Sequence, residues 1–350
     1  MSDVGEGRAV RVVLADDSQT VRAVLRRLLE GAGFEVAGAA ADGEEAVRLV
    51  LEARPDVVLL DLDMPGLDGA EATRAIMESA PRPIVILTSR ADPEEFRQAA
   101  RALAAGALEV VPKPATPDAW VGLQARLAEL LRAAAGRPGA PIAAEGIAQG
   151  SIGAGGGPPP RLVAVGASTG GPTAVRDLLR AMGPVPPVTV LVVQHMAAGF
   201  EAGLAEWLAL ETGMPVRIAA AGEPVGPREV RVAPASAHLT VDAEWRLALD
   251  AESEPVGGHR PSVDALFFSC ARLDPRAVVG ILLTGMGQDG AAGLAALREG
   301  GGLTIAQDPS SCAVRGMPEA AIRTGAAALV LPPAEAGAAV RRLFPEGGGG

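Results

Sequence analysis

Acidic residues in the first part of the chain fall where the strands of a parallel sheet would end. Asp16 and Asp17 close the run Val10–Ala15, and Asp61 closes the run Asp56–Leu60. Because the carboxyl ends of parallel strands meet at one edge of a sheet, we expect these carboxylates to converge. Carboxylate oxygens in this number suit Mg²⁺. A carboxylate beside Mg²⁺ can attack a phosphoryl donor, so the pattern predicts a phosphoryl-acceptor site.

Two further strand ends add an ammonium group and a hydroxyl to this site. Thr88 follows the run Pro83–Leu87, and Lys113 lies just beyond the run Leu108–Val111. The lysine can neutralise phosphoryl charge, and the threonine can donate to the new phosphate. Each residue alone has an ordinary explanation, such as a helix cap for Asp17 or a solvated surface lysine. Their joint placement at successive strand ends favours the acceptor site, and the absence of G-x-G-x-x-G after the first strand disfavours a dinucleotide site.

The second half of the chain offers a serine nucleophile. The segment Gly166–Gly171 reads GASTGG and directly follows the apolar run Leu162–Val165. Its glycines allow a sharp strand-to-helix turn that presents Ser168 at the sheet edge. On this motif alone, an anion-binding turn at the start of the next helix is an equally good interpretation.

A serine nucleophile needs a general base and a carboxylate that orients it. Of the three histidines in the chain, His195 is favoured because it ends the run Val188–Val193, the natural neighbour of the serine strand. The carboxylate candidate is Asp289, in a glycine-rich loop after the run Ala277–Leu283. That aspartate could instead cap the helix that follows it. The order Ser–His–Asp differs from the Ser–Asp–His order of lipase-like esterases, so a small-molecule esterase is disfavoured.

The elements that must position these residues alternate between strand and helix along both halves. Such alternation predicts an α/β fold in each half, with a five-stranded parallel, doubly wound sheet in the first half and a doubly wound, mostly parallel sheet in the second. In the first half, a helix capped by Ser18 and the strand Glu35–Ala39 join the runs above, with helices expected at 43–53, 69–79, 93–105 and 116–132. In the second half, further strands are expected at 230–233, 303–306 and 327–331, a hairpin at 239–241 and 246–248, and helices at 172–182, 200–210, 262–272, 290–299 and 318–324.

A stretch rich in Gly, Pro and Ala separates the two halves. Residues 133–160 have no hydrophobic periodicity and almost no charge, which predicts a flexible linker. We therefore expect a first domain at 1–132, this linker, a second domain at 161–343 and a disordered tail at 344–350.

Composition narrows the partners and the compartment. The net charge is −11, which argues against a nucleic-acid partner and against an anionic membrane surface. The N-terminus lacks the apolar core of a signal peptide, and the apolar runs are of strand length. Two cysteines provide no disulfide framework. We expect a cytoplasmic protein without membrane insertion.

The first half resembles the response-regulator receiver family, whose fold is flavodoxin-like. The segments LADDS, LLDLDMPGLDG, ILTS and PKP carry the resemblance over about residues 10–132. It implies that Asp61 is the phosphorylated residue, that Thr88 and Lys113 form the switch pair, and that a sensor histidine kinase is the phosphodonor. The implied Mg²⁺ ligands are Asp16, Asp17, Asp61 and the backbone carbonyl of Asp63. One departure is Val110, which stands where an aromatic switch residue is common.

The second half resembles the catalytic domain of the CheB family of protein-glutamate methylesterases. The segments VAVGASTGGP, VVQHM, RPSVDALF, LLTGMGQDGAAGL, TIAQDPSSCAV and GMPEAAI carry it. The resemblance implies Ser168 as nucleophile, His195 as base and Asp289 as its orienting partner. It implies backbone N–H groups of Met286 and Thr169 as oxyanion donors, with no cofactor for ester hydrolysis. Arg315 departs from the pattern, because an apolar residue is usual there.

The two resemblances together imply a phosphorylation-activated enzyme. It would demethylate glutamyl esters on methyl-accepting chemoreceptors, releasing methanol, and deamidate certain receptor glutamines. We expect a monomer whose unphosphorylated receiver covers the serine site. A non-catalytic adaptor that only binds receptor helices is the alternative, and the intact Ser–His–Asp set argues against it. A DNA-binding response regulator would need a basic recognition helix, which this acidic chain lacks.

Overall fold

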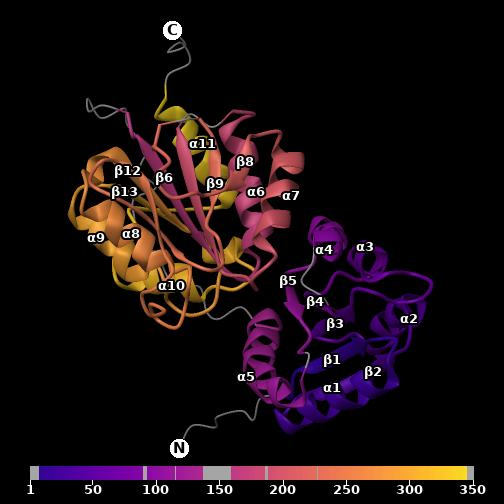
Figure 1. The fold of residues 1–350 in the computed structure, drawn as a ribbon. Coiled ribbons are helices and arrows are strands. Elements are labelled where there is room, and N and C mark those ends of the chain that lie inside the picture. The colour runs from indigo at the N-terminus through magenta and orange to yellow at the C-terminus, as the bar shows by residue number, and fades with distance from the viewer. Residues whose placement is uncertain are drawn as a thin grey trace, which may run out of the picture. The chain divides into compact units, whose positions relative to one another are not determined.

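The computed structural model describes residues 8–89, 93–114, 116–136, 159–185, 188–226 and 228–344. These residues form two compact units, one before and one after residues 137–158 in the sequence (Figure 1). Each unit is built around its own parallel sheet. None of the described helices is both long enough and apolar enough to cross a membrane.

The first unit is a five-stranded parallel sheet with helices on both faces. Its strand order is β2-β1-β3-β4-β5, which confirms the predicted doubly wound, receiver-type fold. The strands are β1 (Arg11–Ala15), β2 (Glu35–Ala40), β3 (Val57–Asp61), β4 (Ile84–Thr88) and β5 (Glu109–Pro112). The helices are α1 (Gln19–Gly31), α2 (Gly43–Ala53), α3 (Gly69–Ser79), α4 (Pro93–Ala105) and α5 (Pro117–Ala134).

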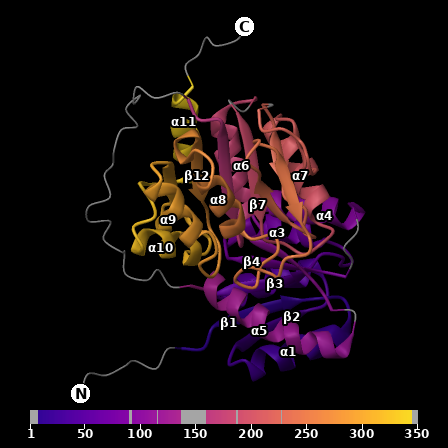
Figure 2. The ribbon, with the colours of Figure 1, turned by 60° about the vertical axis from the view of Figure 1, so that its left-hand side comes forward.

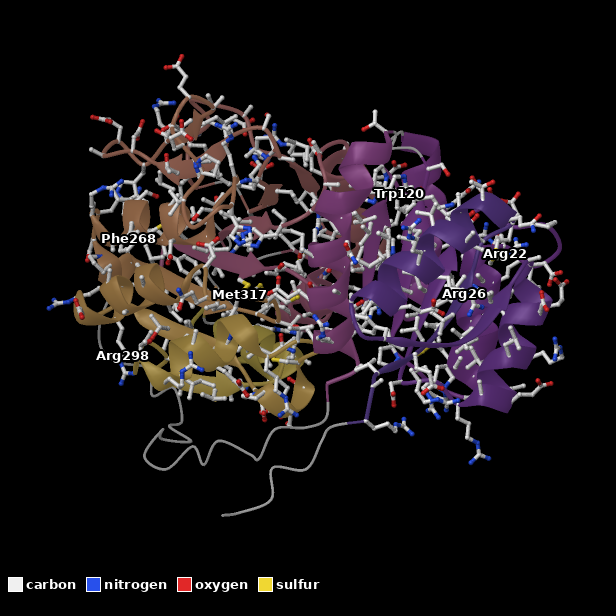
Figure 3. The ribbon with its side chains drawn as sticks, turned by 90° about the horizontal axis from the view of Figure 1, so that it is seen from below. Arg22, Arg26, Trp120, Phe268, Arg298 and Met317 are labelled. Carbon is white, nitrogen blue, oxygen red and sulfur yellow. The ribbon has the colours of Figure 1, made fainter. Side chains whose placement is uncertain are left out.

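The strands β3 and β4 are apolar up to their last residue, as expected where helices cover both faces of a sheet. Both strands are buried at every position. Helix α1 shows the complementary pattern of a surface helix. Its Leu25 and Leu29 are buried, whereas Arg26 is exposed (Figure 3).

The second unit contains a seven-stranded parallel sheet and a small antiparallel hairpin. The sheet order is β14-β13-β12-β6-β7-β9-β8, so β6 lies in the middle with β12 and β7 beside it. Its strands are β6 (Leu162–Ala167), β7 (Thr189–Gln194), β8 (Val216–Ile218), β9 (Val230–Val232), β12 (Val278–Leu282), β13 (Leu303–Gln307) and β14 (Leu329–Leu331). The hairpin pairs β10 (His238–Val241) with β11 (Leu247–Asp250).

Two groups of helices cover this second sheet. Helices α6, α7 and α11 lie on one face, and α8, α9 and α10 lie on the other (Figures 1 and 2). Their bounds are α6 (Gly171–Met182), α7 (Glu201–Thr212), α8 (Val263–Ala271), α9 (Ala291–Glu299), α10 (Gly316–Arg323) and α11 (Pro333–Arg342). Single 3₁₀ turns occur at Pro275–Ala277 and Pro309–Ser311.

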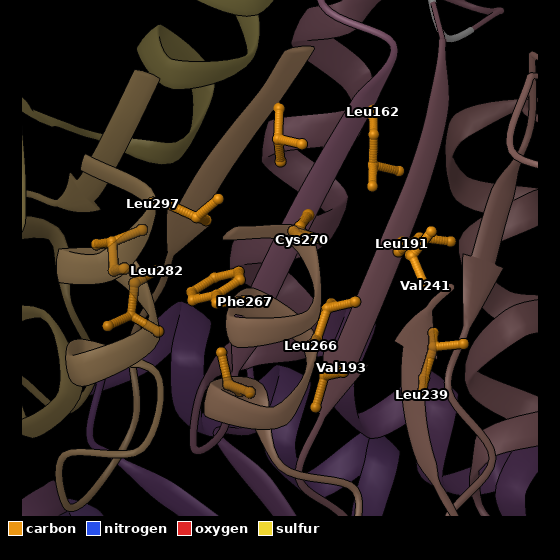
Figure 4. Close-up of a cluster of buried hydrophobic side chains, with 14 of the residues drawn as sticks. Leu162, Leu191, Val193, Leu239, Val241, Leu266, Phe267, Cys270, Leu282 and Leu297 are labelled. Atoms are coloured by element: carbon orange, nitrogen blue, oxygen red, sulfur yellow. The ribbon is translucent and has the colours of Figure 1, made fainter. Parts of the chain in front are cut away.

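Helix α8 packs closely on the sheet, and this packing positions the site. Phe267 and Leu266 are fully buried among leucines and valines of β6, β7, β12 and the hairpin (Figure 4). Gly166, near the end of β6, is required for this approach: a Cβ there would lie 2.1 Å from Cγ1 of Val263. The first turn of α8 therefore lies at the carboxyl edge of the sheet.

One strand and one α-helix of the second unit were not predicted. Strand β8 has only three residues, and its Arg217 pairs with Glu223 and Glu229. Such a short, charged edge strand leaves almost no pattern in the sequence. Helix α11 is rich in alanine, but the whole chain is alanine-rich, so alanine content is weak evidence for a helix here. Its contact with α6 is tertiary: a Cβ on Gly337 would lie 2.1 Å from the carbonyl oxygen of Leu178.

The interdomain stretch is only partly covered by the structure. Helix α5 continues to Ala134, two residues into the predicted linker. The rest of that prediction, from 137 to 158, lies outside the described residues, as does the predicted tail from 345 onwards.

Candidate phosphoacceptor and active sites

The acidic residues of the first unit converge as predicted. Carboxylate oxygens of Asp16, Asp17 and Asp61 all lie within 4.8 Å of one another. The Nζ atom of Lys113 lies 2.7 Å from Asp16 Oδ2 and 2.7 Å from Asp61 Oδ1. Asp16 and Asp61 are buried, whereas Asp17 is exposed. The cluster therefore has a buried floor and one solvent-facing carboxylate.

Burial dominates the electrostatics of this cluster. It raises the pKa of Asp61 to about 6, with a smaller contribution from the negative charge of Asp16, although Lys113 opposes the shift. Burial lowers the pKa of Lys113, but its bonds to Asp16 and Asp61 outweigh that effect, and the net pKa is raised. One lysine does not fully compensate the buried carboxylates. A hard divalent cation fits this donor set, because it would supply the missing positive charge.

The other predicted receiver residues lie around the cluster. Thr88 is fully buried at the end of β4, and its carbonyl accepts a 2.7 Å hydrogen bond from the Lys113 backbone N–H. Asp63 is exposed just beyond β3. Val110 is half-buried and packs against the core of the first unit. The structure thus brings Asp16, Asp17, Asp61, Thr88 and Lys113 to one sheet edge.

The Ser168 turn follows the central strand β6 of the second sheet. The Ser168 N–H donates to the carbonyl of Thr284 at 2.9 Å, and its own carbonyl accepts from Gln194 Nε2 at 2.7 Å. Gly170 has φ +74°, a conformation that favours glycine, and the helix α6 begins directly after it. These bonds tie the serine backbone to both neighbouring strands and leave Ser168 half-buried.

His195 and Asp289 come together across the end of β6. The Nε2 atom of His195 lies 2.9 Å from Oδ2 of Asp289. The backbone N–H of His195 donates to the carbonyl of Ala167 at 3.0 Å, which joins the histidine to the residue before the serine. The other ring nitrogen, Nδ1, is buried and has no hydrogen-bond partner among the described residues. Nδ1 is therefore the ring nitrogen that is available to accept a proton from another group.

Asp289 is held by the first turn of helix α8. Its Oδ1 accepts from Ser262 Oγ at 2.9 Å and from the Asp264 N–H at 3.0 Å, and its Oδ2 accepts from the Val263 N–H at 2.8 Å. Burial acts to raise the pKa of Asp289, but the hydrogen bonds from His195 and from this helix N-terminus outweigh it, and the pKa is lowered. Asp289 is therefore an ionised, fully oriented carboxylate.

The loop before Asp289 passes directly beside the serine. A Cβ on Gly285 would lie 2.6 Å from Ser168 Cβ and 2.2 Å from Met317 Sδ. The next residue, Met286, is half-buried, and its N–H makes no hydrogen bond within the described part of the chain. Thr169 is buried, and its carbonyl accepts from Thr284 Oγ1 at 2.9 Å. The loop is thus close enough to Ser168 to offer backbone donors to a reacting carbonyl.

Sequence reasoning missed the residues that support this site. The sequence predicted Ser262 only as the start of a helix, yet its hydroxyl also binds Asp289. The alternative role of Asp289 as a cap of the following helix is not what the structure shows: Gly290 occupies the N-cap of α9, and Asp289 binds α8 instead. The sequence pattern that predicts Ser262 as a helix cap does not show that the carboxylate of Asp289, from a distant loop, binds the same helix end.

Together the two units define a response regulator whose output unit is a hydrolase with an α/β fold. The family model for the response regulator receiver domain matches residues 12–123, and the model for CheB methylesterase matches residues 163–340. The chain belongs to the CheB methylesterase family. This membership confirms the predicted enzyme class and sets aside the non-catalytic adaptor.

Curated relatives and a solved structure agree with this assignment. A protein-glutamate methylesterase/protein-glutamine glutaminase of Symbiobacterium thermophilum is 41% identical over 97% of this chain and 98% of its own length. A second protein of that name, from Anaeromyxobacter dehalogenans, is 42% identical over 98% of this chain and 99% of its own. The crystal structure of the Thermotoga maritima CheB methylesterase catalytic domain is 33% identical, with a TM-score of 0.50, and covers 53% of this chain and 98% of that one.

Proposed function

We propose that this chain hydrolyses methyl esters of glutamate side chains on methyl-accepting chemoreceptors and releases methanol. The observation that carries the proposal is the 2.9 Å contact between His195 and Asp289 at the sheet edge that also holds the Ser168 turn. The names of the two curated relatives support the choice of a glutamyl substrate. Removal of receptor methyl groups would give adaptation in chemotaxis-type signalling.

In the first half-reaction, His195 acts as the general base. Ionised Asp289 holds the proton of His195 on Nε2, which leaves the lone pair of Nδ1 free. Nδ1 takes the Ser168 hydroxyl proton while Oγ attacks the ester carbonyl carbon. The N–H groups of Met286 and Thr169 donate to the resulting oxyanion. The bond to the methoxy oxygen then breaks, His195 gives its proton to that oxygen, and methanol leaves a glutamyl-Ser168 ester.

In the second half-reaction, water replaces the alcohol. Nδ1 of His195 takes a proton from water, whose oxygen attacks the acyl carbon. The bond to Ser168 Oγ breaks, the proton returns to that oxygen, and a free glutamate remains. A glutamine carboxamide can follow the same route with ammonia as the leaving group. We therefore include deamidation of certain receptor glutamines in the proposal.

Asp61 is the proposed phosphorylation site of the receiver. Asp16, Asp17 and Asp61, with the carbonyl of Asp63, would hold Mg²⁺, which supplies positive charge to the phosphoryl oxygens when bound. The carboxylate of Asp61 attacks the phosphorus of a donor phosphohistidine, whose bond to nitrogen breaks. Lys113 pairs with the new aspartyl phosphate, and the Thr88 hydroxyl donates to it.

Phosphorylation of Asp61 would then raise hydrolase activity. A sensor histidine kinase of the chemotaxis type is the proposed phosphodonor. We place the receiver at 1–132, with helix α5 continuing to Ala134, a linker from there to residue 160 and the catalytic domain at 161–343. We further propose a cytoplasmic monomer without nucleic-acid partners.

A direct test of the chemistry is methanol release from membranes that carry methylated receptors. The wild-type chain should release methanol, and Ser168→Ala should abolish the release. A wild-type chain that releases none, or an unchanged rate in Ser168→Ala, would overturn the enzymatic proposal.

A second assay tests the switch. Addition of a small-molecule phosphodonor and Mg²⁺ should raise the wild-type rate, and Asp61→Asn should keep the basal rate without that rise. Equal stimulation in Asp61→Asn would show that the receiver does not act through this residue.

A further inference from the structure

A second histidine covers one face of the His195 ring. The rings of His195 and His259 are parallel to within 1°, with centroids 4.0 Å apart. A stacked ring covers a face and makes no contact through the nitrogen-bearing edges of its partner. At one edge of the His195 ring Nε2 contacts Asp289, and at the other edge Nδ1 has no hydrogen-bond partner among the described residues. The stack is therefore a second restraint on the ring, independent of its hydrogen bond to Asp289.

The turn that carries His259 has a defined conformation. Val256 and His259 exchange backbone hydrogen bonds of 3.1 Å and 3.0 Å. Gly257 and Gly258 between them have φ +60° and +85°, the left-handed conformation required at both central positions of such a tight turn. The residue after the turn, Arg260, donates from Nη1 to the carbonyls of Ala251 and Ser253 at 2.9 Å and 3.0 Å.

One short segment therefore contacts both members of the His–Asp pair. His259 stacks on the imidazole, and the α8 N-terminus, only a few residues later, binds the Asp289 carboxylate. A single hydrogen bond at Nε2 lets an imidazole swing about that bond, which would change the direction in which Nδ1 points. A flat ring against its face removes this freedom, because the tilt would force the two rings into each other.

We propose that His259 is a positioning residue for the general base: its ring, by stacking, holds His195 in the plane that directs Nδ1 towards Ser168. The inference rests on the proposed function in that it takes His195 as the base. It assigns the effect of His259 to ring shape rather than to its nitrogen atoms. Loss of the stack should lower the rate of the chemical step by about tenfold, the scale of a favourable aromatic pair.

The experiment compares three full-length variants, His259→Ala, His259→Phe and His259→Gln. Phenylalanine keeps a flat ring without ring nitrogens, glutamine keeps polarity without a ring, and alanine keeps neither. We expect kcat for methanol release to fall about tenfold in the alanine and glutamine variants with KM within about twofold of wild type. The phenylalanine variant should keep most of the wild-type kcat. Thermal unfolding of each variant checks that the chain is folded.

A second readout does not depend on the substrate. The rate at which a fluorophosphonate labels Ser168 requires the nucleophile and its base but no receptor, and it should follow the same order among the variants. Low labelling in the phenylalanine variant, wild-type labelling in the alanine and glutamine variants, or a change in KM alone would overturn the inference. If the wild-type chain is labelled but releases no methanol, the substrate proposal fails, and labelling still decides the role of His259.

Discussion

The two sites of this chain occupy the same position in two parallel sheets but treat a buried carboxylate in opposite ways. Asp61 is 3% exposed, and Lys113 is the cation beside it. Its pKa is raised to about 6, mainly by burial. Asp289 is 6% exposed and accepts from the α8 N-terminus and Ser262, beside His195. Burial opposes ionisation there too, but these donors outweigh it and the pKa is lowered.

The difference shows that the number of fixed hydrogen-bond donors around a buried carboxylate decides what that carboxylate can do. The lone pairs of Asp289 are occupied by fixed donors, so this group is suited to orient a base and unsuited to attack a substrate. Asp61 has fewer fixed donors, so it can accept a cation and a phosphoryl group. The same sheet edge thus produces an orienting carboxylate in one unit and a reactive one in the other.

The largest expected effect comes from a substitution of Asp289, the carboxylate whose lone pairs are all occupied by fixed donors. In Asp289→Asn, the side-chain amide cannot accept from all the donors and no longer fixes the His195 proton on Nε2. We expect kcat for methanol release to fall by about 10³- to 10⁴-fold, as in other serine hydrolases. Asp68→Asn is the matched control, because Asp68 caps helix α3 through the Glu71 N–H in the other unit. A rate within tenfold of wild type for Asp289→Asn would contradict its assigned role.

Opposite pH dependences of stability are the next expectation. The folded pKa of Asp61 is about 6, above its ordinary 3.8, so this group favours folding below pH 3.8 and that contribution is lost as pH rises to about 6. The loss is about 3 kcal/mol at most, without divalent cations. The lowered pKa of Asp289 has the reverse sign: its contribution is present above pH 3.8 and is lost as pH falls through the lowered value.

Urea unfolding can follow the receiver through its single tryptophan. Trp120 lies in α5, and the other two tryptophans, Trp207 and Trp245, lie in the second unit and can be replaced by phenylalanine. Between pH 4 and pH 7, in the presence of a chelator, the receiver should lose stability, and Asp61→Asn should remove most of that loss. Rising stability of the unsubstituted receiver over this range would refute the assigned sign.

Bound Mg²⁺ should occupy the carboxylate lone pairs of the receiver cluster that have no fixed donor, and should therefore stabilise the receiver. At a Mg²⁺ concentration about 100 times its dissociation constant, the receiver should gain about 3 kcal/mol in its free energy of unfolding. Asp17→Asn removes the exposed carboxylate of the cluster and should reduce this gain at the same concentration. The Trp120 signal measures both. An identical Mg²⁺ effect in the variant would place the ion elsewhere.

The sequence predicted the reacting groups of both sites better than their supports. Asp61, Ser168 and His195 lie within three residues of the end of an apolar run, and strand-end geometry brings such residues together without further information. Ser262 and His259 carry no such signal, because their role depends on how α8 packs against β6. That packing requires Gly166 beside Val263, a contact between residues far apart in the chain. Local sequence patterns reveal where strands end. Which hydrogen-bond donors surround a carboxylate depends instead on tertiary packing between elements that are far apart in the sequence.

The smallest expected effect separates the two functions of one hydroxyl. Ser262 Oγ accepts from the Ala265 N–H as a helix cap and donates to Asp289. In the receiver, Ser18 Oγ caps α1 by accepting from the Val21 N–H. Both Ser262→Ala and Ser18→Ala should cost about 1 kcal/mol of stability in their own units. Only Ser262→Ala should also lower basal kcat, by about tenfold, since it removes one charge-assisted bond to Asp289. Equal basal rates in the two variants would mean that the backbone donors of α8 alone suffice to hold the carboxylate.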